Sequence, residues 1–371
     1  MKPVFWTSLA LLVYTYAGYP LWVWLRTYWH LRPVARAAVF PSVSVVMAVH
    51  NEAPVLADKL RNLSSLEYPS ERYEIVVISD GSTDGTNQIL ASAATDKLRV
   101  LVSPENRGKA AALNEAVAVA KGEIVVFTDA RQWIDAEAIR HLVANFADPS
   151  VGCVSGNLCL GKPGNSTGKG VGLYWQIEKQ IRRSEAATGS MVGTTGALYA
   201  ARRKLLVPLP KATVLDDVYI PMHVVRQDKR VVFEPRALAW DHAPNESGWE
   251  FRRKVRTLLG NYQLIKLAPW LVTPRNPLLF EFLSHKMLRL LGPFLLSALL
   301  LSSLVLPGPF YRTALAMQAA FYLLALAALM KSRPRLFGRI ADVAFTFVML
   351  NTAALVALLY FVSGKREVWT R

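Results

Sequence analysis

Residues Glu74 to Thr86, which read EIVVISDGSTDGT, decide the fold of this chain. The β-branched run at positions 75–78 is typical of a buried strand in a parallel sheet. The turn after it is rich in Asp, Gly and Ser, and either Ser82 or Asp84 can cap the helix expected next. Asp80 should therefore lie at the carboxyl end of a buried strand, where open α/β sheets bind their ligands. Taken alone, the pattern also suits an ordinary strand–turn–helix corner.

Two other apolar runs end in polar residues in the same way. Residues 123–130 read EIVVFTDA, so a second buried strand closes on a carboxylate, Asp129. The run at 42–50, SVSVVMAVH, is followed directly by Asn51 and Glu52. Three strands therefore bring polar groups to one edge of one sheet. Carboxylates gathered there suit a ribose, a uracil ring or a divalent metal.

Strand and helix patterns alternate along the first half of the chain, which predicts a doubly wound α/β domain. The expected strands end at residues 50, 80, 103 and 129, and the expected helices cover 54–66, 85–94, 108–120 and 135–146. The first turn between strand and helix reads His50-Asn51-Glu52 rather than GxGxxG, which disfavours a classical dinucleotide-binding fold.

The composition favours a membrane partner. The chain has 371 residues, with 43 Lys or Arg against 27 Asp or Glu, and its net charge is +16. A basic chain can bind nucleic acid or an anionic membrane surface. No basic stretch is interleaved with aromatic residues as a nucleic-acid groove requires, and 52% of the residues are hydrophobic. The expected partner is therefore the lipid bilayer and not a nucleic acid.

Long apolar runs at both ends divide the chain into three parts. Residues 1–40 hold a transmembrane helix and a linker, because the apolar run there is too long for a cleaved signal peptide. Residues 41–265 form the α/β domain. Residues 266–371 hold an interfacial helix near 278–291 and three candidate spans, at 292–306, 314–330 and 340–362.

Basic residues predict the orientation of these parts. Three arginines and a histidine follow the first span, so by the positive-inside rule the α/β domain is cytoplasmic and the N-terminus lies outside. This pattern is expected of a multi-pass protein of the plasma membrane, the inner membrane of a bacterium. Counting four spans puts the tail at 363–371 outside, although its three basic residues conflict with the same rule.

Six short motifs, taken in order, resemble those of the inverting, membrane-anchored glycosyltransferases of family 2, which have the GT-A fold. They are HNE at Glu52, SDGSTDGT at Asp80, GKAAALN at Lys109, FTDA at Asp129, TGALY at Gly196 and DD at Asp216-Asp217. The resemblance covers about residues 43–263 and extends to the hyaluronan, chitin-oligosaccharide and poly-N-acetylglucosamine synthases. Each motif is weak singly, but the ordered set with flanking membrane helices is specific.

The resemblance implies a role for each matched residue. Glu52 and Asp80 would bind the uracil and ribose of a nucleotide sugar, and Lys109 would meet its phosphates. Asp129 would be the first acid of the DxD signature, which holds Mg²⁺ or Mn²⁺ against the pyrophosphate. Asp217 would be the catalytic base.

The sequence departs from the family pattern at the metal signature. It reads Asp129-Ala130-Arg131, so an arginine replaces the second acid. A metal would lose one ligand, or Arg131 could supply part of the metal's charge at the phosphates. His242 is a candidate for an extra ligand, although a lone histidine is more often structural.

A second departure concerns the QxxRW signature of processive synthases. It appears here as RKVRT at 253–257, which keeps Arg256 but has neither Gln nor Trp, so long-chain processivity is in doubt. Arg256 is expected at the nucleotide and Arg253 at the acceptor. The alternative is a basic helix that rests on lipid phosphates.

The acceptor side is expected around Gly196, which matches the family's segment near the acceptor sugar. Trp175, Glu178 and Arg182 on the amphipathic helix 173–187 suit an acceptor platform. A helix lying on the membrane surface explains the same pattern equally well.

Inverting transfer requires one base to take the proton of the acceptor hydroxyl while the nucleotide leaves from the opposite face of the sugar. Asp217 suits this role because its neighbour Asp216 should raise one pKa of the pair. Asp216 itself is expected to cap a helix and, as the other acid of the pair, is the second candidate for the catalytic site. Lys109, the metal and Arg256 are expected to offset the charge of the leaving group.

These expectations describe a transferase that moves a sugar from a nucleotide sugar, expected to be a UDP-sugar, to a saccharide acceptor at the membrane, in polysaccharide or exopolysaccharide synthesis. Two alternatives remain open. One is the addition of a single sugar to a polyprenyl phosphate or another lipid-linked acceptor. The other is a non-catalytic protein that binds nucleotide sugars and has lost its metal site, for which Arg131 is the support.

Overall fold

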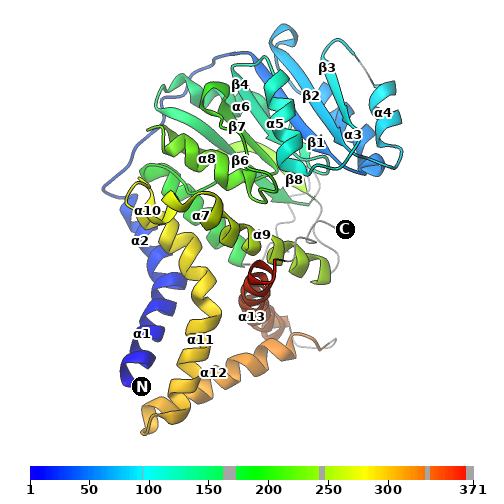
Figure 1. The fold of residues 1–371 in the computed structure, drawn as a ribbon. Coiled ribbons are helices and arrows are strands. Elements are labelled where there is room, and N and C mark those ends of the chain that lie inside the picture. The colour runs from blue at the N-terminus through cyan, green and yellow to red at the C-terminus, as the bar shows by residue number, and fades with distance from the viewer. Residues whose placement is uncertain (94, 162–172, 242–246, 331–334, 365–371) are drawn as a thin grey trace.

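The computed structural model describes residues 1–371 apart from 94, 162–172, 242–246, 331–334 and 365–371. A sheet with helices on both faces forms one part of the molecule, and long helices extending from one side of it form the other (Figure 1). Helices α7 (Leu173–Thr188) and α9 (Ser247–Leu267) lie where the two parts meet (Figure 1).

Four parallel strands form the first half of the sheet, in the order β3-β2-β1-β4. Their side chains alternate between two hydrophobic layers, as the period of a strand requires. All strands and helices predicted in this half are present, so the doubly wound arrangement is confirmed here. The strands are β1 (Val43–Val49), β2 (Tyr73–Asp80), β3 (Leu98–Ser103) and β4 (Ile124–Thr128), and the helices are α3 (Ala53–Ser64), α4 (Thr86–Ser92), α5 (Lys109–Val119) and α6 (Ala138–Ala144).

The second half of the sheet is mixed. β7 (Leu198–Arg202) runs antiparallel to both β4 and β6 (Val151–Leu160). β6 is parallel to β8 (Arg230–Asp241), and the two-residue β5 (Trp133–Ile134) forms the edge. Because β7 is antiparallel to β4, the loop that precedes β7 lies beside the carboxyl end of β4. That loop contains Gly196.

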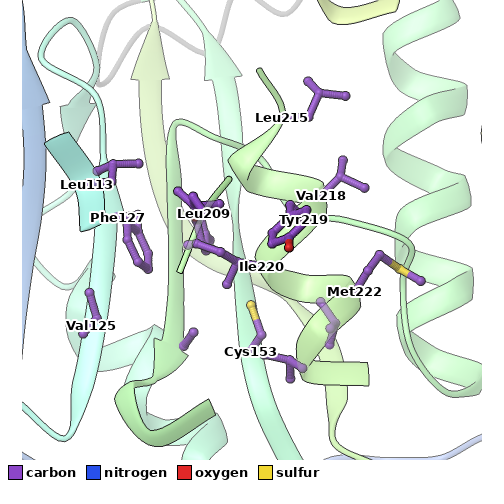
Figure 2. Close-up of a cluster of buried hydrophobic side chains, with 14 of the residues drawn as sticks. Leu113, Val125, Phe127, Cys153, Leu209, Leu215, Val218, Tyr219, Ile220 and Met222 are labelled. Atoms are coloured by element: carbon purple, nitrogen blue, oxygen red, sulfur yellow. The ribbon is translucent and has the colours of Figure 1, made fainter. Parts of the chain in front are cut away.

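Helix α8 (Asp216–Val225) covers this half of the sheet with apolar side chains. Figure 2 shows Val218, Ile220 and Met222 of α8 gathered with side chains of the sheet, among them Phe127 of β4 and Cys153 of β6. All five side chains are buried, and the most exposed of them, Val218, is 4% exposed. This packing fixes the first turn of α8, which carries two acids, against the same edge of the sheet.

Among the described residues, four helices are long and apolar enough to cross a membrane: 2–26, 279–305, 309–327 and 338–362. The first two each contain a π-helical turn. They comprise α1 (Lys2–Val13), η1 (Tyr14–Gly18) and α2 (Tyr19–Arg26), and then α10 (Leu279–Phe282), η7 (Leu283–Met287) and α11 (Leu288–Val305). The segment at 278–291, expected as a separate interfacial helix, instead continues without a break into the span after it.

The last two helices bring the chain back to the sheet domain. α12 (Pro309–Ala327) starts beside the N-terminus. The ring centroids of Phe310 and Phe5 lie 6.0 Å apart there. α13 (Arg335–Val362) then packs through Ala353 and Ala357 against Val255 and Leu259 of α9. The end of α13 therefore lies on the side of the sheet domain (Figure 1), whereas counting spans in the sequence put it on the opposite side. Four short 3₁₀ turns complete the described structure: η2 (Ser70–Arg72), η3 (Asn145–Ala147), η5 (Arg203–Leu205) and η6 (Pro269–Val272).

Candidate active site

The turn after β2 determines where α5 begins. The carboxylate of Asp80 accepts the backbone N–H groups of the two residues before Lys109, at 2.9 and 2.7 Å. Gly81 has φ +65°, and a Cβ added there would stand 2.3 Å from the backbone nitrogen of Asn106. Only glycine lets the two segments approach this closely. Lys109 is the first residue of α5, so its position depends on this turn.

The turn after β1 is hydrogen-bonded to the turn after β2. Asn51, at φ 53°, accepts the backbone N–H of Thr83 through Oδ1 at 2.8 Å, and the backbone N–H of Glu52 donates to Thr86 Oγ1 at 3.0 Å. Asp84, one of the two predicted capping residues, accepts the backbone N–H of Thr86 at 2.9 Å. The structure therefore brings Glu52 and the Asp80 turn together at one edge of the sheet, as predicted.

Lys109 bridges acids from two different elements. Its Nζ lies 2.9 Å from Asp129 Oδ1, directly after β4, and 3.2 Å from Asp216 Oδ1, at the start of α8. Burial favours the neutral amine, but the two carboxylates raise the pKa of Lys109, so the side chain stays charged. Burial would raise the pKa of Asp129, but Lys109 lowers it. A fixed cation at this point can stabilise negative charge that develops on a ligand.

The adjacent acids Asp216 and Asp217 face different partners. Asp216 is buried and accepts the hydroxyl of Tyr199 at 3.1 Å. The expectation that Asp216 caps α8 is wrong, because its carboxylate binds Tyr199 and the lysine and makes no capping hydrogen bond. Asp217 Oδ2 accepts the backbone N–H of Gly196 at 3.1 Å. Burial and the charge of Asp216 raise the pKa of Asp217 to about 6, so this carboxylate can take a proton at neutral pH.

Two arginines extend the positive charge around the acid after β4. Burial and Lys109 have the largest effects on the pKa of Asp129. The positive charges of Arg256 and Arg131 lower that pKa further. Arg256 belongs to α9, so a helix that comes more than 100 positions after Asp129 in the sequence contributes charge to the same site. Arg253 lies one turn earlier on α9, and its predicted acceptor role stays a prediction.

Among the described residues, no group of three or more His, Cys, Asp or Glu side chains could hold a metal ion. Asp129 offers one carboxylate whose side chain is 40% exposed and whose Oδ1 is paired with Lys109. A single carboxylate fits Mg²⁺, which is commonly held by one or two carboxylates together with substrate phosphates. The predicted ligand His242 lies outside the described residues.

A pocket beside the acid pair is lined by α7 and by the sheet. Trp175, Glu178 and Arg182 of α7 line it together with Thr195, the residue before Gly196. Burial and Asp216 raise the pKa of Asp217, and the positive charge of Arg182 opposes them by lowering it. The structure thus brings together the three residues predicted as an acceptor platform and puts them next to the candidate base.

Sequence reasoning missed buried polar residues that support the site. Lys59 of α3 is 3% exposed and donates to Thr128 Oγ1 at 3.0 Å, just before Asp129. Burial lowers the pKa of Lys59 to about 7. Tyr199, which binds Asp216, stacks on Phe127 with ring centroids 4.6 Å apart. Lys59 gave no signal, because a lysine in an amphipathic helix suggests a solvent-facing residue. Tyr199 ends the TGALY motif, but a tyrosine in a strand suggests ordinary core and not a partner of Asp216.

Residues 44–207 match the family described as glycosyl transferase family 2. A poly-beta-1,6-N-acetyl-D-glucosamine synthase of Staphylococcus epidermidis is 30% identical over 234 residues, which cover 62% of this chain and 56% of that protein. The synthase of the same name from Staphylococcus aureus is 27% identical over 229 residues, which cover 60% and 55%. The chain therefore spans a little over half the length of these curated relatives.

Among solved structures, the chain is similar to a mannosyltransferase from Pyrobaculum calidifontis in complex with GDP-Man and Mn²⁺. The two are 25% identical with a TM-score of 0.73, and the match covers 98% of this chain and 99% of that one. The likeness therefore extends over the sheet domain and the long helices together.

Proposed function

We propose that this chain, which carries a glycosyltransferase family 2 domain with the GT-A fold, transfers a sugar with inversion from a UDP-sugar to a saccharide acceptor at a membrane. The observation that carries the proposal is the arrangement around Lys109. This cation joins Asp129 at the end of β4 to the acid pair, and Asp217 faces Gly196 beside a pocket. The synthases of the two Staphylococcus species support a product made of N-acetylglucosamine.

In the proposed reaction the nucleotide binds across the turns that carry Glu52 and Asp80. Asp217 takes the proton of the acceptor hydroxyl as that oxygen attacks the anomeric carbon, and the bond to the nucleoside diphosphate breaks on the opposite face. Lys109 and Arg256 stabilise the negative charge that gathers on the leaving phosphate. Asp216 keeps Lys109 and Tyr199 in place beside the base.

Asp129 would hold a divalent cation, Mg²⁺ or Mn²⁺, against the pyrophosphate. The bound ion would supply charge that stabilises the leaving phosphates. The Mn²⁺ that accompanies GDP-Man in the Pyrobaculum complex supports this assignment. Arg131, which replaces the second acid of the signature, would add positive charge on the same side.

We place the protein in the plasma membrane, the inner membrane of a bacterium, with the sheet domain in the cytoplasm. This arrangement is supported by the four helices suited to crossing a membrane in the part of the chain that the structure describes, and by the basic residues after the first of them. The bilayer is then a structural partner of the enzyme.

The decisive experiment offers radiolabelled donors singly to the purified protein in detergent, with an N-acetylglucosamine tetrasaccharide as acceptor. Label from UDP-N-acetylglucosamine is expected to enter products longer than the acceptor, and excess chelator to reduce the rate. If neither GDP-mannose nor any UDP-sugar in the series transfers its sugar although UDP binds, the result favours the non-catalytic alternative.

A second candidate function rests on the whole-chain likeness to the mannosyltransferase crystallised with GDP-Man. In that case GDP-mannose would be the donor. Addition of only one sugar, or transfer only to a polyprenyl phosphate, would instead favour the lipid-linked alternative, which the missing Trp of the QxxRW signature also supports.

A further inference from the structure

Three buried ionisable side chains meet where the membrane helices reach α7. His285 of η7 is 1% exposed, and Glu178 and Glu185 of α7 are 6% and 2% exposed. The Nδ1 atom of His285 lies 2.8 Å from Glu185 Oε1, and its Nε2 atom lies 3.1 Å from Glu178 Oε1. The imidazole ring therefore lies between two carboxylates, with one nitrogen directed at each.

Neighbouring groups keep both acids ionised. Tyr19 donates to Glu185 Oε1 at 2.6 Å, and Arg289 donates to Glu178 Oε2 at 2.6 Å. Burial favours the neutral acid, but the charges of His285 and Arg289 hold the pKa of Glu178 well below its usual range. Burial would also raise the pKa of Glu185, but His285 and the hydrogen bond from Tyr19 lower it. The cluster therefore joins α2, α7 and the helix of η7 through charge-assisted hydrogen bonds.

A local change in helix geometry orients His285. His285 lies in the π-helical turn η7, and the first membrane helix has its own π-helical turn, η1. The two turns are in direct contact, because the hydroxyls of Tyr14 and Ser284 lie 2.8 Å apart. A π-helical turn holds one more residue than an α-helical turn, so it rotates the side chains that follow, and such turns occur frequently at functional sites.

The cluster connects directly to the candidate active site. Glu178 accepts a hydrogen bond from Arg182 at 3.3 Å, and both side chains line the pocket beside Gly196. Burial and Asp216 have the largest effects on the pKa of the candidate base, Asp217. The charges of Arg182 and of Lys286, the residue after His285, lower that pKa. A change at His285 can therefore reach the reaction through Glu178 and Arg182, which it helps to hold.

We propose that His285 is a positioning residue, which binds both acids of α7 and so holds Glu178 and Arg182 on the acceptor side of Asp217. The inference rests on the proposed function, because the pocket in question is the one proposed to bind the acceptor. In this proposal, a residue of a membrane helix determines the shape of the acceptor pocket. The turns after β1 and β2 hold the residues on the donor side.

The first test is His285→Gln. The amide can donate to one acid, but its oxygen then faces the other buried carboxylate. That carboxylate loses the hydrogen bond from the ring and keeps only its other donors, Tyr19 at Glu185 or Arg182 and Arg289 at Glu178. With UDP-N-acetylglucosamine and the N-acetylglucosamine tetrasaccharide, the KM for the acceptor is expected to rise about tenfold or more. The KM for the donor should not change. Tyr14→Phe is the matched control, because it removes a neutral hydrogen bond between the same two membrane helices and leaves the acids paired.

A second substitution separates positioning from packing. In the double variant His285→Gln, Glu185→Gln, the new amide at 185 can donate to the amide oxygen at 285, whose N–H groups then face Glu178. The acceptor KM should return most of the way to the wild-type value. If His285 served packing alone, the second change would bring no recovery.

Hydrogen exchange supplies a readout that needs no sugar. Amides of α7 should exchange about tenfold faster in His285→Gln, return toward the wild-type rate in the double variant, and leave α5 unaffected. An unchanged acceptor KM, unchanged exchange in α7, or a double variant no better than the single one would overturn the proposal. If the wild-type protein transfers no sugar, the proposed function fails, while the exchange measurement still tests His285.

Discussion

At the scale of single residues, Asp217 and Asp216 are adjacent in sequence but suited to different tasks. Asp217→Asn keeps an oxygen that can accept the N–H of Gly196 but cannot take a proton. Its kcat should fall by roughly 10²-fold or more, the usual range for loss of a general base, while the affinity for UDP in calorimetry stays the same. In the wild-type enzyme kcat/KM should fall as the pH falls through about 6, because the base becomes protonated there.

Asp216→Asn is the matched comparison at the same scale. The charge of Asp216 raises the pKa of Asp217, so its removal should move the acidic limb of the pH profile to lower pH. Turnover should also drop, since Lys109 loses one of its two partners. An acidic limb that survives unchanged in Asp217→Asn would mean that another group is the base.

The residue scale also shows where prediction from sequence stopped. Asp80, Asp129 and the acid pair were recognisable because each ends a strand or begins a helix in a motif. The capping role expected of Asp216 failed, because a helix-start acid looks like a cap unless its distant partners, Lys109 and Tyr199, are known. His285 gave no signal, since the acids that it binds lie 100 and 107 positions away.

At the scale of elements, the turn after β2 governs where α5 begins. Gly81→Ala would drive a Cβ into the backbone at Asn106, so the turn must shift and carry Lys109 with it. We expect a loss of about 1–3 kcal/mol of stability, seen as a lower Tm in detergent, together with weaker UDP binding. Gly85→Ala in the same motif is the control. Its φ is −70° and its added Cβ would meet only Ala53 Cβ at 3.7 Å. Equal effects of the two substitutions would contradict this account.

Elements of the first half of the sheet could be predicted because each is a short β-branched run followed by a helix. In the second half, strands near 193–201 and 230–234 could be recognised, but the order and direction of the strands could not. A hydrophobic run indicates a strand but not its direction, so the antiparallel β7 beside β4 was invisible in the sequence. The two-residue β5 is too short to show a pattern. The charges at 281–289 suggested an interfacial helix, but they serve the buried contacts of a continuous membrane helix.

At the scale of the whole molecule, α13 decides the topology. Its last turns pack against α9, which belongs to the sheet domain, so the end of the described chain should lie in the cytoplasm. In a bacterial host, a fluorescent protein fused after Ser363 should fluoresce, whereas alkaline phosphatase fused there should be inactive. Alkaline phosphatase inserted in the turn between α11 and α12 should be active. The reverse result at Ser363 would mean that α12 crosses the membrane completely.

The pairing of the two π-helical turns also has a consequence for biogenesis. Tyr14 meets Ser284, 270 positions later, and Arg26 meets Glu281, 255 positions later. At roughly 5–20 residues per second, a ribosome needs on the order of 15 to 50 seconds to make the intervening chain. During that interval Tyr14 and Arg26 of the first membrane helix lack the partners that they have in the folded protein. The pace of translation, and insertion factors that shelter this helix meanwhile, therefore become determinants of how much enzyme a cell can make.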